Sequence, residues 1–113
     1  MGTKVRDGLY KMNFHTVHGT GTGMIYASTG KLRGGNSAFA FIGSYAVKDG
    51  KVTARIATTR YNEDPRFQPL FGTDQVTLAL TADAGDGDVI DFDGNALQMP
   101  GIQFKALLTR LSD

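Results

Sequence analysis

Cysteine is absent from the 113-residue chain, and its absence excludes one class of structure and one class of site. Without thiols the protein cannot form disulfide bonds or hold zinc through thiolates. Proline is scarce, with 3 residues, whereas glycine is abundant, with 15. That balance is typical of a folded chain with many tight turns. We therefore expect one globular domain, residues 1–113, without a disulfide framework.

Long apolar segments are absent as well. No apolar run approaches the roughly 18 residues of a membrane-spanning helix. The first residues, MGTKVRDG, also lack the apolar core of a secretion signal. We expect a cytoplasmic protein that does not bind membranes.

The net charge of +1 hides an uneven distribution. Residues 1–66 contain ten Lys and Arg against four acidic residues, and the remainder contains two against seven. Such a split can steer a charged partner, but charge scattered over the outer face of a β-meander explains it more simply.

The clearest structural signal is a pair of strand-like runs in residues 38–61. AFAFIGSYAVK and KVTARIATTRY flank Asp49-Gly50, a dipeptide favoured in two-residue type I′ turns. A two-residue turn fixes the register, and alternate pairs then share one face. The pairs expected on this inner face are Val47–Val52, Tyr45–Ala54, Gly43–Ile56, Phe41–Thr58 and Phe39–Arg60.

Strand patterns recur along the rest of the chain. A loop at residues 62–69 contains Pro65 and Pro69, and one helical turn is conceivable at residues 68–72. No amphipathic stretch is long enough for a crossover helix, so the strands are expected to be antiparallel. Seven or eight short strands of this kind either close into a barrel or stack as a sandwich, and we favour an all-β, eight-stranded up-and-down barrel. The further strands are expected at residues 9–17, 20–28, 31–33, 76–82, 89–92, 96–99 and 102–111, with turns that include Asp86-Gly87 and Asp93-Gly94.

Two glycine-rich or acidic runs are weak candidates for ligand sites. The GTGTG run at residues 19–23 resembles a phosphate loop, but a strand and not a helix follows it. Close packing in a small barrel explains these glycines better. The run of Asp83, Asp86, Asp88, Asp91 and Asp93 does not match a calcium-binding loop, and two Asp-Gly turns beside an acidic strand explain it better.

Other candidates for chemistry are weaker still. His15 and His18 are expected at the surface, where they cannot easily share a metal. Basic residues near aromatic ones suggest an oligonucleotide-binding face, but the aromatic residues belong to the predicted inner face and not to a stacking platform. We therefore expect neither an enzyme nor direct nucleic-acid binding, and no metal or other cofactor.

Several sequence blocks together resemble a known family. They are Asp7-Gly8-Leu9-Tyr10, Gly21-Thr22-Gly23, Leu32-Arg33-Gly34-Gly35-Asn36, Phe41-Ile42-Gly43-Ser44-Tyr45 and Arg60-Tyr61-Asn62. In this order and spacing they are similar to the small negative-regulator proteins of bacterial type III secretion, the GrlR-like family.

The resemblance implies a calycin-like, lipocalin-resembling barrel that is commonly a homodimer in the bacterial cytoplasm. It also implies a non-enzymatic regulator of virulence-gene expression, which binds a transcriptional activator protein and not DNA. In that family's best-known member, an acidic hairpin loop takes part in partner binding. The matching loop here is Lys48-Asp49-Gly50-Lys51, with two lysines and one acid, so its partner is expected to differ in charge.

Two hypotheses therefore remain: a protein-binding regulator, and a barrel that binds a small apolar ligand inside. A cavity of about 300 Å³ or more favours the ligand hypothesis, and a filled interior with an exposed apolar patch favours the regulator. An enzyme needs convergent ionisable groups in the same cavity. The predicted pocket consists of Tyr10, Met12, Phe14, Phe39, Phe41, Tyr45, Ile56 and Leu78, with Arg60 at one rim.

Overall fold

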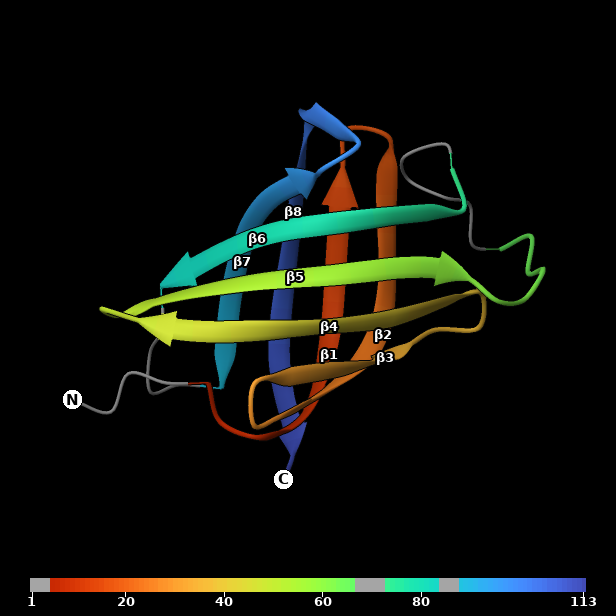
Figure 1. Cartoon of the computed structure of the whole chain (residues 1–113). Coiled ribbons are helices and arrows are strands. Elements are labelled where there is room, and N and C mark those ends of the chain that lie inside the picture. The colour runs from red at the N-terminus through yellow and green to blue at the C-terminus, as the bar shows by residue number, and fades with distance from the viewer. Residues whose placement is uncertain (1–4, 67–72, 84–87) are drawn as a thin grey trace.

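The structure, a computed structural model, describes residues 5–66, 73–83 and 88–113. Its strands are joined in chain order into a closed antiparallel barrel, in which the last strand pairs with the first (Figure 1). The described residues contain no helix, so the predicted all-β, up-and-down, calycin-like barrel is confirmed. The strands are β1 (Gly8–Thr16), β2 (Gly19–Ser28), β3 (Lys31–Gly35), β4 (Phe39–Lys48), β5 (Lys51–Arg60), β6 (Gln75–Asp83), β7 (Val89–Ala96) and β8 (Met99–Ser112).

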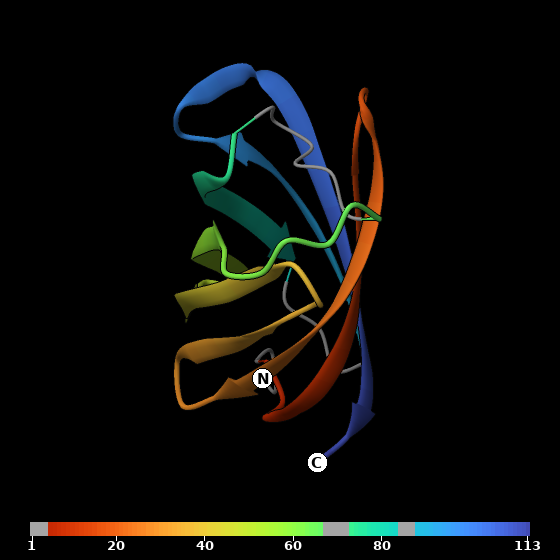
Figure 2. The ribbon, with the colours of Figure 1, turned by 90° about the vertical axis from the view of Figure 1, so that its right-hand side faces the viewer.

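The barrel has two walls whose strands cross steeply. Strands β1, β2 and β8 run along one wall, and β3 to β6 run across the other (Figure 1, Figure 2). Alternate side chains from both walls point inward and form one apolar core. The largest fully buried members of this core include Tyr10, Phe41, Met12 and Ile25.

The β4–β5 hairpin has the predicted register and turn. Every predicted pair is present, from Val47 opposite Val52 to Phe39 opposite Arg60. Asp49 and Gly50 both have positive φ values, of 53° and 77°, as a type I′ turn requires. The predicted inner and outer faces of this hairpin are therefore confirmed.

The prediction of a turn at Asp93-Gly94 is wrong, because both residues lie within β7. Gly94 pairs with Leu80 on β6, and a β-carbon at Gly94 would lie 1.9 Å from the carbonyl oxygen of Ala79. Glycine is needed here for the close approach of two strands and not for a change of chain direction.

The predicted short strand at residues 96–99 is also wrong. Strand β7 ends at Ala96, and a two-residue turn at Leu97 and Gln98 leads directly into β8 at Met99. The conceivable helical turn at residues 68–72 and the Asp86-Gly87 turn lie outside the described residues.

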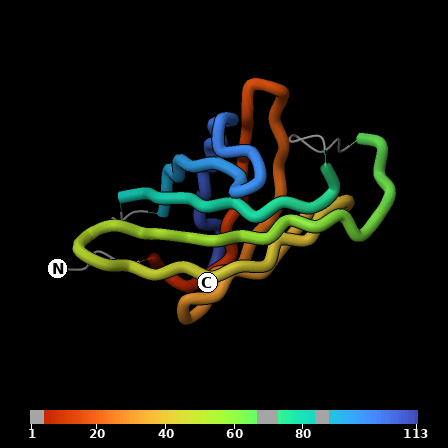
Figure 3. Tube along the Cα trace, turned by 45° about the horizontal axis from the view of Figure 1, so that its top comes forward, coloured from red at the N-terminus to blue at the C-terminus, as the bar shows by residue number. Residues whose placement is uncertain are grey.

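The strands differ in length, and this places one hairpin beyond its neighbours. Strand β2 pairs with β1 from Gly19 onward, but its pairing with β3 begins only at Met24. The β1–β2 hairpin therefore extends past the end of β3 (Figure 3). The first half of β2 borders the cavity described next.

Candidate functional site: a cavity at one end of the barrel

A cavity of about 470 Å³ lies at the barrel end where β1 turns into β2, β3 into β4 and β5 leads to β6. Its wall combines an apolar interior with glycine and polar residues from the connecting segments. The apolar residues are Met12, Phe14, Phe39, Phe41, Val76, Leu78 and Phe104, and the others are His18, Gly19, Thr20, Gly21, Thr22, Asn36, Thr58, Arg66 and Thr73.

The glycines of β2 accommodate the aromatic rings of the cavity wall. A β-carbon at Gly21 would lie 2.6 Å from the Phe14 ring, and one at Gly23 would lie 2.6 Å from the Phe41 ring. The Phe14 ring also meets Phe41 edge-on and stacks on Phe104, with centroids 5.9 and 5.7 Å apart. The GTGTG run therefore serves close packing, as the sequence predicted, and holds the rings at the edge of the cavity.

The opposite end of the barrel is filled by buried side chains. Tyr10 is completely buried there, and its hydroxyl donates a hydrogen bond of 2.6 Å to the Arg6 carbonyl oxygen. Burial raises the pKa of the Tyr10 hydroxyl above its ordinary value. Val52 and Ile25 are also completely buried. This filled end leaves the other end as the site of the cavity.

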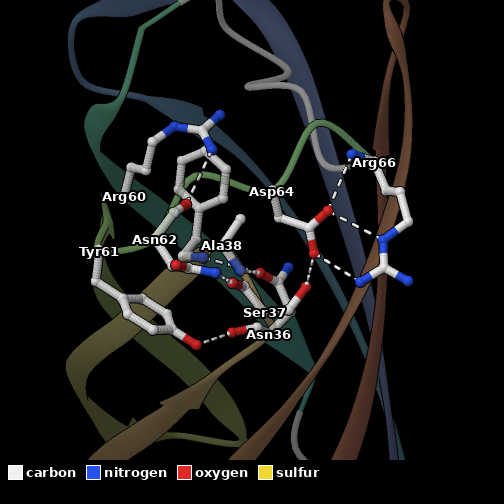
Figure 4. A network of polar contacts seen from close by, with 9 residues as sticks. Asn36, Ser37, Ala38, Arg60, Tyr61, Asn62, Asp64 and Arg66 are labelled. Carbon is white, nitrogen blue, oxygen red and sulfur yellow. Dashed lines mark hydrogen bonds and ion pairs between the residues drawn. The ribbon is translucent and has the colours of Figure 1, made fainter.

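A polar network ties the β3–β4 turn to the segment that follows β5 (Figure 4). The Asn36 side-chain oxygen accepts hydrogen bonds from the backbone N–H groups of Ala38 and Phe39, each of 2.9 Å. The Tyr61 hydroxyl donates to the Asn36 carbonyl oxygen at 2.6 Å, and Asn62 donates to the Ser37 carbonyl oxygen at 2.8 Å. These contacts hold one rim of the cavity in place.

Asp64 is the buried acidic residue of this rim, with 7% of its surface exposed. Its carboxylate accepts hydrogen bonds from the Arg66 guanidinium at 2.8 and 3.0 Å and from the Ser37 hydroxyl at 2.5 Å. These bonds, first from Arg66 and then from Ser37, hold the pKa of Asp64 far below its ordinary value. Asp64 is therefore ionised at neutral pH and offers no proton for acid catalysis.

The residues predicted to line a pocket divide into two groups. Met12, Phe14, Phe39, Phe41 and Leu78 belong to the cavity wall. The others are not among its described lining: Tyr10 and Ile56 are fully buried in the core, and Tyr45 is only partly buried against it.

Arg60 takes part in the rim without lining the cavity. Its guanidinium lies over the Phe39 ring, 4.7 Å from the centroid, and donates to Asp74 at 2.9 Å. It also lies 3.8 Å from Glu63. Among the described lining residues, the ionisable side chains are those of His18 and Arg66. Arg60 thus stabilises the Phe39 ring, which itself faces the cavity.

The loop predicted to bind a partner lies at the filled end of the barrel. Lys48 and Asp49 are exposed at the tip of the β4–β5 hairpin, beside Gly50. The Lys51 amino group contacts the Asp83 carboxylate at 2.5 Å across the strands. The loop is therefore accessible, but it is remote from the cavity, and the two predicted sites are separate.

Sequence reasoning missed the polar part of the cavity wall. His18, expected only as a surface residue, lies in the β1–β2 turn at the cavity, and Thr58 faces it from β5. The predicted register already placed Thr58 opposite Phe41 on the inner face, so the position of Thr58 in the cavity wall could have been predicted. The positions of Asn36 and Arg66 could not be predicted in this way, because both residues lie in loops, where side-chain direction does not follow strand alternation.

The sequence matches no known family model and no curated protein. Among residues 5–66, 73–83 and 88–113, no cluster of three His, Cys, Asp or Glu residues is arranged to hold a metal ion. The same residues include no helix of sufficient length and hydropathy to cross a membrane. The cavity is therefore the feature from which a function can be argued.

Proposed function

We propose that the protein binds a small apolar ligand in the cavity at the end of its barrel. The observation that carries this proposal is the volume of about 470 Å³ behind a wall of Phe, Met, Leu and Val side chains. Ligand pockets typically measure about 300–1,000 Å³ and combine apolar walls with few polar groups. A small barrel whose side chains simply fill its interior leaves no such space.

The polar groups near the cavity support binding and not catalysis. The Arg66 guanidinium is already engaged with Asp64 through two nitrogens. His18 lies in the β1–β2 turn, and its backbone N–H donates to the Thr16 hydroxyl. Acid–base chemistry needs a base held within hydrogen-bond reach of its target by a third group. The proposed role is therefore non-enzymatic and needs no cofactor.

A fluorescence titration tests the ligand proposal directly. N-phenyl-1-naphthylamine, a neutral apolar dye, is expected to bind the wild-type protein with one-to-one stoichiometry and an emission increase. The variant Thr58→Trp fills the cavity from β5 and is expected to bind the dye at least tenfold more weakly. Ile42→Trp places the same side chain on the outer face of β4 as a control. Equal binding by all three proteins contradicts the proposal.

A second candidate function is the one that the GrlR-like resemblance implies. In this proposal the protein is a cytoplasmic, dimeric regulator that captures a partner protein, such as a transcriptional activator. The supporting observation is exposed apolar surface on the outer face of β2 and β4, where Tyr26 is 43% and Ile42 is 53% exposed. Both residues pair with Arg33 on β3, so the three side chains form one cross-strand row with Arg33 in the middle. Affinity capture from native lysate with mass spectrometry, comparing wild type with Ile42→Glu, tests this candidate.

A further inference from the structure

Among the residues that the structure describes, the first half of β2 has a strand partner on one side only, and its other edge lies beside the cavity. From Gly19 to Gly23 this strand pairs with β1, while pairing with β3 starts only at Met24. Figure 1 and Figure 3 both show this part of β2 without a strand on its other side. Unpaired strand edges are the sites at which extended peptides add to sheets.

The direction of the free backbone groups follows from one hydrogen bond. The Thr22 carbonyl oxygen accepts from the Asn36 side-chain nitrogen at 2.9 Å, on the side of β2 that faces β3. Backbone groups of alternate residues point to the same side of an antiparallel strand. The N–H and C=O groups of Thr20, and the N–H of Thr22, therefore also point away from β1. Within the described chain, no strand residue pairs with them on that side.

The side chains of β2 show where a new strand would direct its own residues. The glycines at 19, 21 and 23 alternate with Thr20 and Thr22, and the rings of Phe14 and Phe41 lie over Gly21 and Gly23 on the inner side. Thr20 and Thr22 are exposed, and by alternation their side chains point to the outer side, while their backbone lies along the edge of the cavity. Residues of an added strand that face Gly19 and Gly21 would therefore point inward to the cavity, and the residue that faces Thr20 would point outward.

The surrounding charge selects the sign of the occupant. No acidic residue occurs between residues 8 and 48, a stretch that contains four Lys and Arg and both histidines. On the outer face of β1, His15 pairs with Thr20 and Lys11 pairs with Met24. Lys11 is the charged side chain of this outer face, and the Asp64 carboxylate at the nearby rim is already paired with Arg66, so outward-pointing acidic residues on an added strand would meet the face favourably.

We propose that an extended acidic peptide with apolar residues at alternate positions adds to the free edge of β2 and inserts its apolar side chains into the cavity. The peptide continues the line of β3 and makes main-chain hydrogen bonds to Thr20 and Thr22. This inference rests on the proposed function only in requiring that the cavity admit an apolar group.

Fluorescence anisotropy with a labelled Asp-Leu-Asp-Leu-Asp peptide tests the inference. The wild-type protein is expected to bind it, and to bind Lys-Leu-Lys-Leu-Lys at least tenfold more weakly. Thr20→Pro removes one edge N–H without touching the β1 ladder, and it should weaken binding by about tenfold. Thr20→Val, which keeps the N–H, should bind like the wild type. A peptide N-methylated at its central residue tests the same ladder if Thr20→Pro does not fold.

The results separate this inference from the ligand proposal. Strand addition is supported if binding weakens when the Thr20 N–H is removed by Thr20→Pro, or when the central N–H of the peptide is methylated, while Thr20→Val binds the peptide like the wild type. No peptide binding at millimolar concentration, or equal binding by Thr20→Pro, the N-methylated peptide and their parents, overturns it. In either of those cases, continued binding of N-phenyl-1-naphthylamine leaves the ligand proposal intact. Peptide binding without dye binding contradicts the ligand proposal alone.

Discussion

Replacing Phe41 by Ala removes the ring that links the core of the barrel to its cavity. Phe41 is 2% exposed, meets Phe14 edge-on and lies against Gly23. Truncation of a buried Phe to Ala typically costs about 3–5 kcal/mol. The ring also borders the cavity at the barrel end, so the vacated space joins a volume that already exists. We therefore expect a loss at the lower end of that range, about 3 kcal/mol.

The matched control lies one residue along the same strand. Ile42 points outward and is 53% exposed, so Ile42→Ala removes an apolar side chain from the other face of β4. Surface truncations of this kind usually change stability by about 0.5 kcal/mol or less. The contrast between neighbouring positions therefore reports the inner and outer faces of the hairpin and not a general sensitivity of β4.

Urea denaturation followed by far-UV circular dichroism measures both variants. The expected result is a clearly lower midpoint for Phe41→Ala and a nearly unchanged midpoint for Ile42→Ala, with similar slopes. An unchanged midpoint for Phe41→Ala would remove this ring from the core and refute the assignment of the inner face. Equal losses in both variants would refute the alternation of faces along β4.

Three further predictions follow from contacts elsewhere in the barrel. Gly43→Ala should lower the free energy of unfolding by roughly 2 kcal/mol or more, because its β-carbon would lie 2.0 Å from a carbonyl oxygen of β5. This loss is measured as a lower urea midpoint. Gly101→Ala should leave the midpoint nearly unchanged, because the space around Gly101 is open. Equal midpoints for the two variants would contradict this steric explanation. Because the folded pKa of Asp64 is lowered, its stabilising contribution is present above the ordinary carboxyl pKa of about 3.9 and is lost as pH falls further. Urea unfolding of Asp64→Asn should therefore depend less on pH between about pH 4 and pH 2 than that of the wild type, and parallel pH profiles would argue against the network. Reversing Lys48 and Lys51 to Glu should alter partner capture in a pull-down but leave the thermal midpoint nearly unchanged, and unaltered capture counts against this loop as a contact.

The fold could be predicted from the sequence because local signals and the global arrangement agreed. The dipeptide Asp49-Gly50 fixed a register, and side-chain alternation then assigned Phe41 to the inside and Ile42 to the outside. The same dipeptide pattern failed at Gly94, where glycine serves strand contact. Sequence alone cannot distinguish these two uses, since both need a residue without a β-carbon.

The candidate site was predictable only in part, because a cavity is what packing leaves empty. The inward direction of Phe14 and Phe39 followed from alternation, but the space between them depends on strand lengths. The early end of β3 at Gly35 and the exposed loop residue Arg66, which borders the cavity, help determine where the cavity lies. Neither feature has a periodic signature in the sequence.

A chemical-shift titration of the isotope-labelled protein with N-phenyl-1-naphthylamine tests directly whether the end cavity binds an apolar ligand. Saturable shifts are expected for backbone amides around the cavity, at Gly21, Thr58, Leu78 and Phe104. Amides at the filled end, such as Val52, should remain unchanged. Shifts confined to the outer face, or none at all at saturating dye, would contradict the claim that this barrel binds apolar ligands through its end cavity.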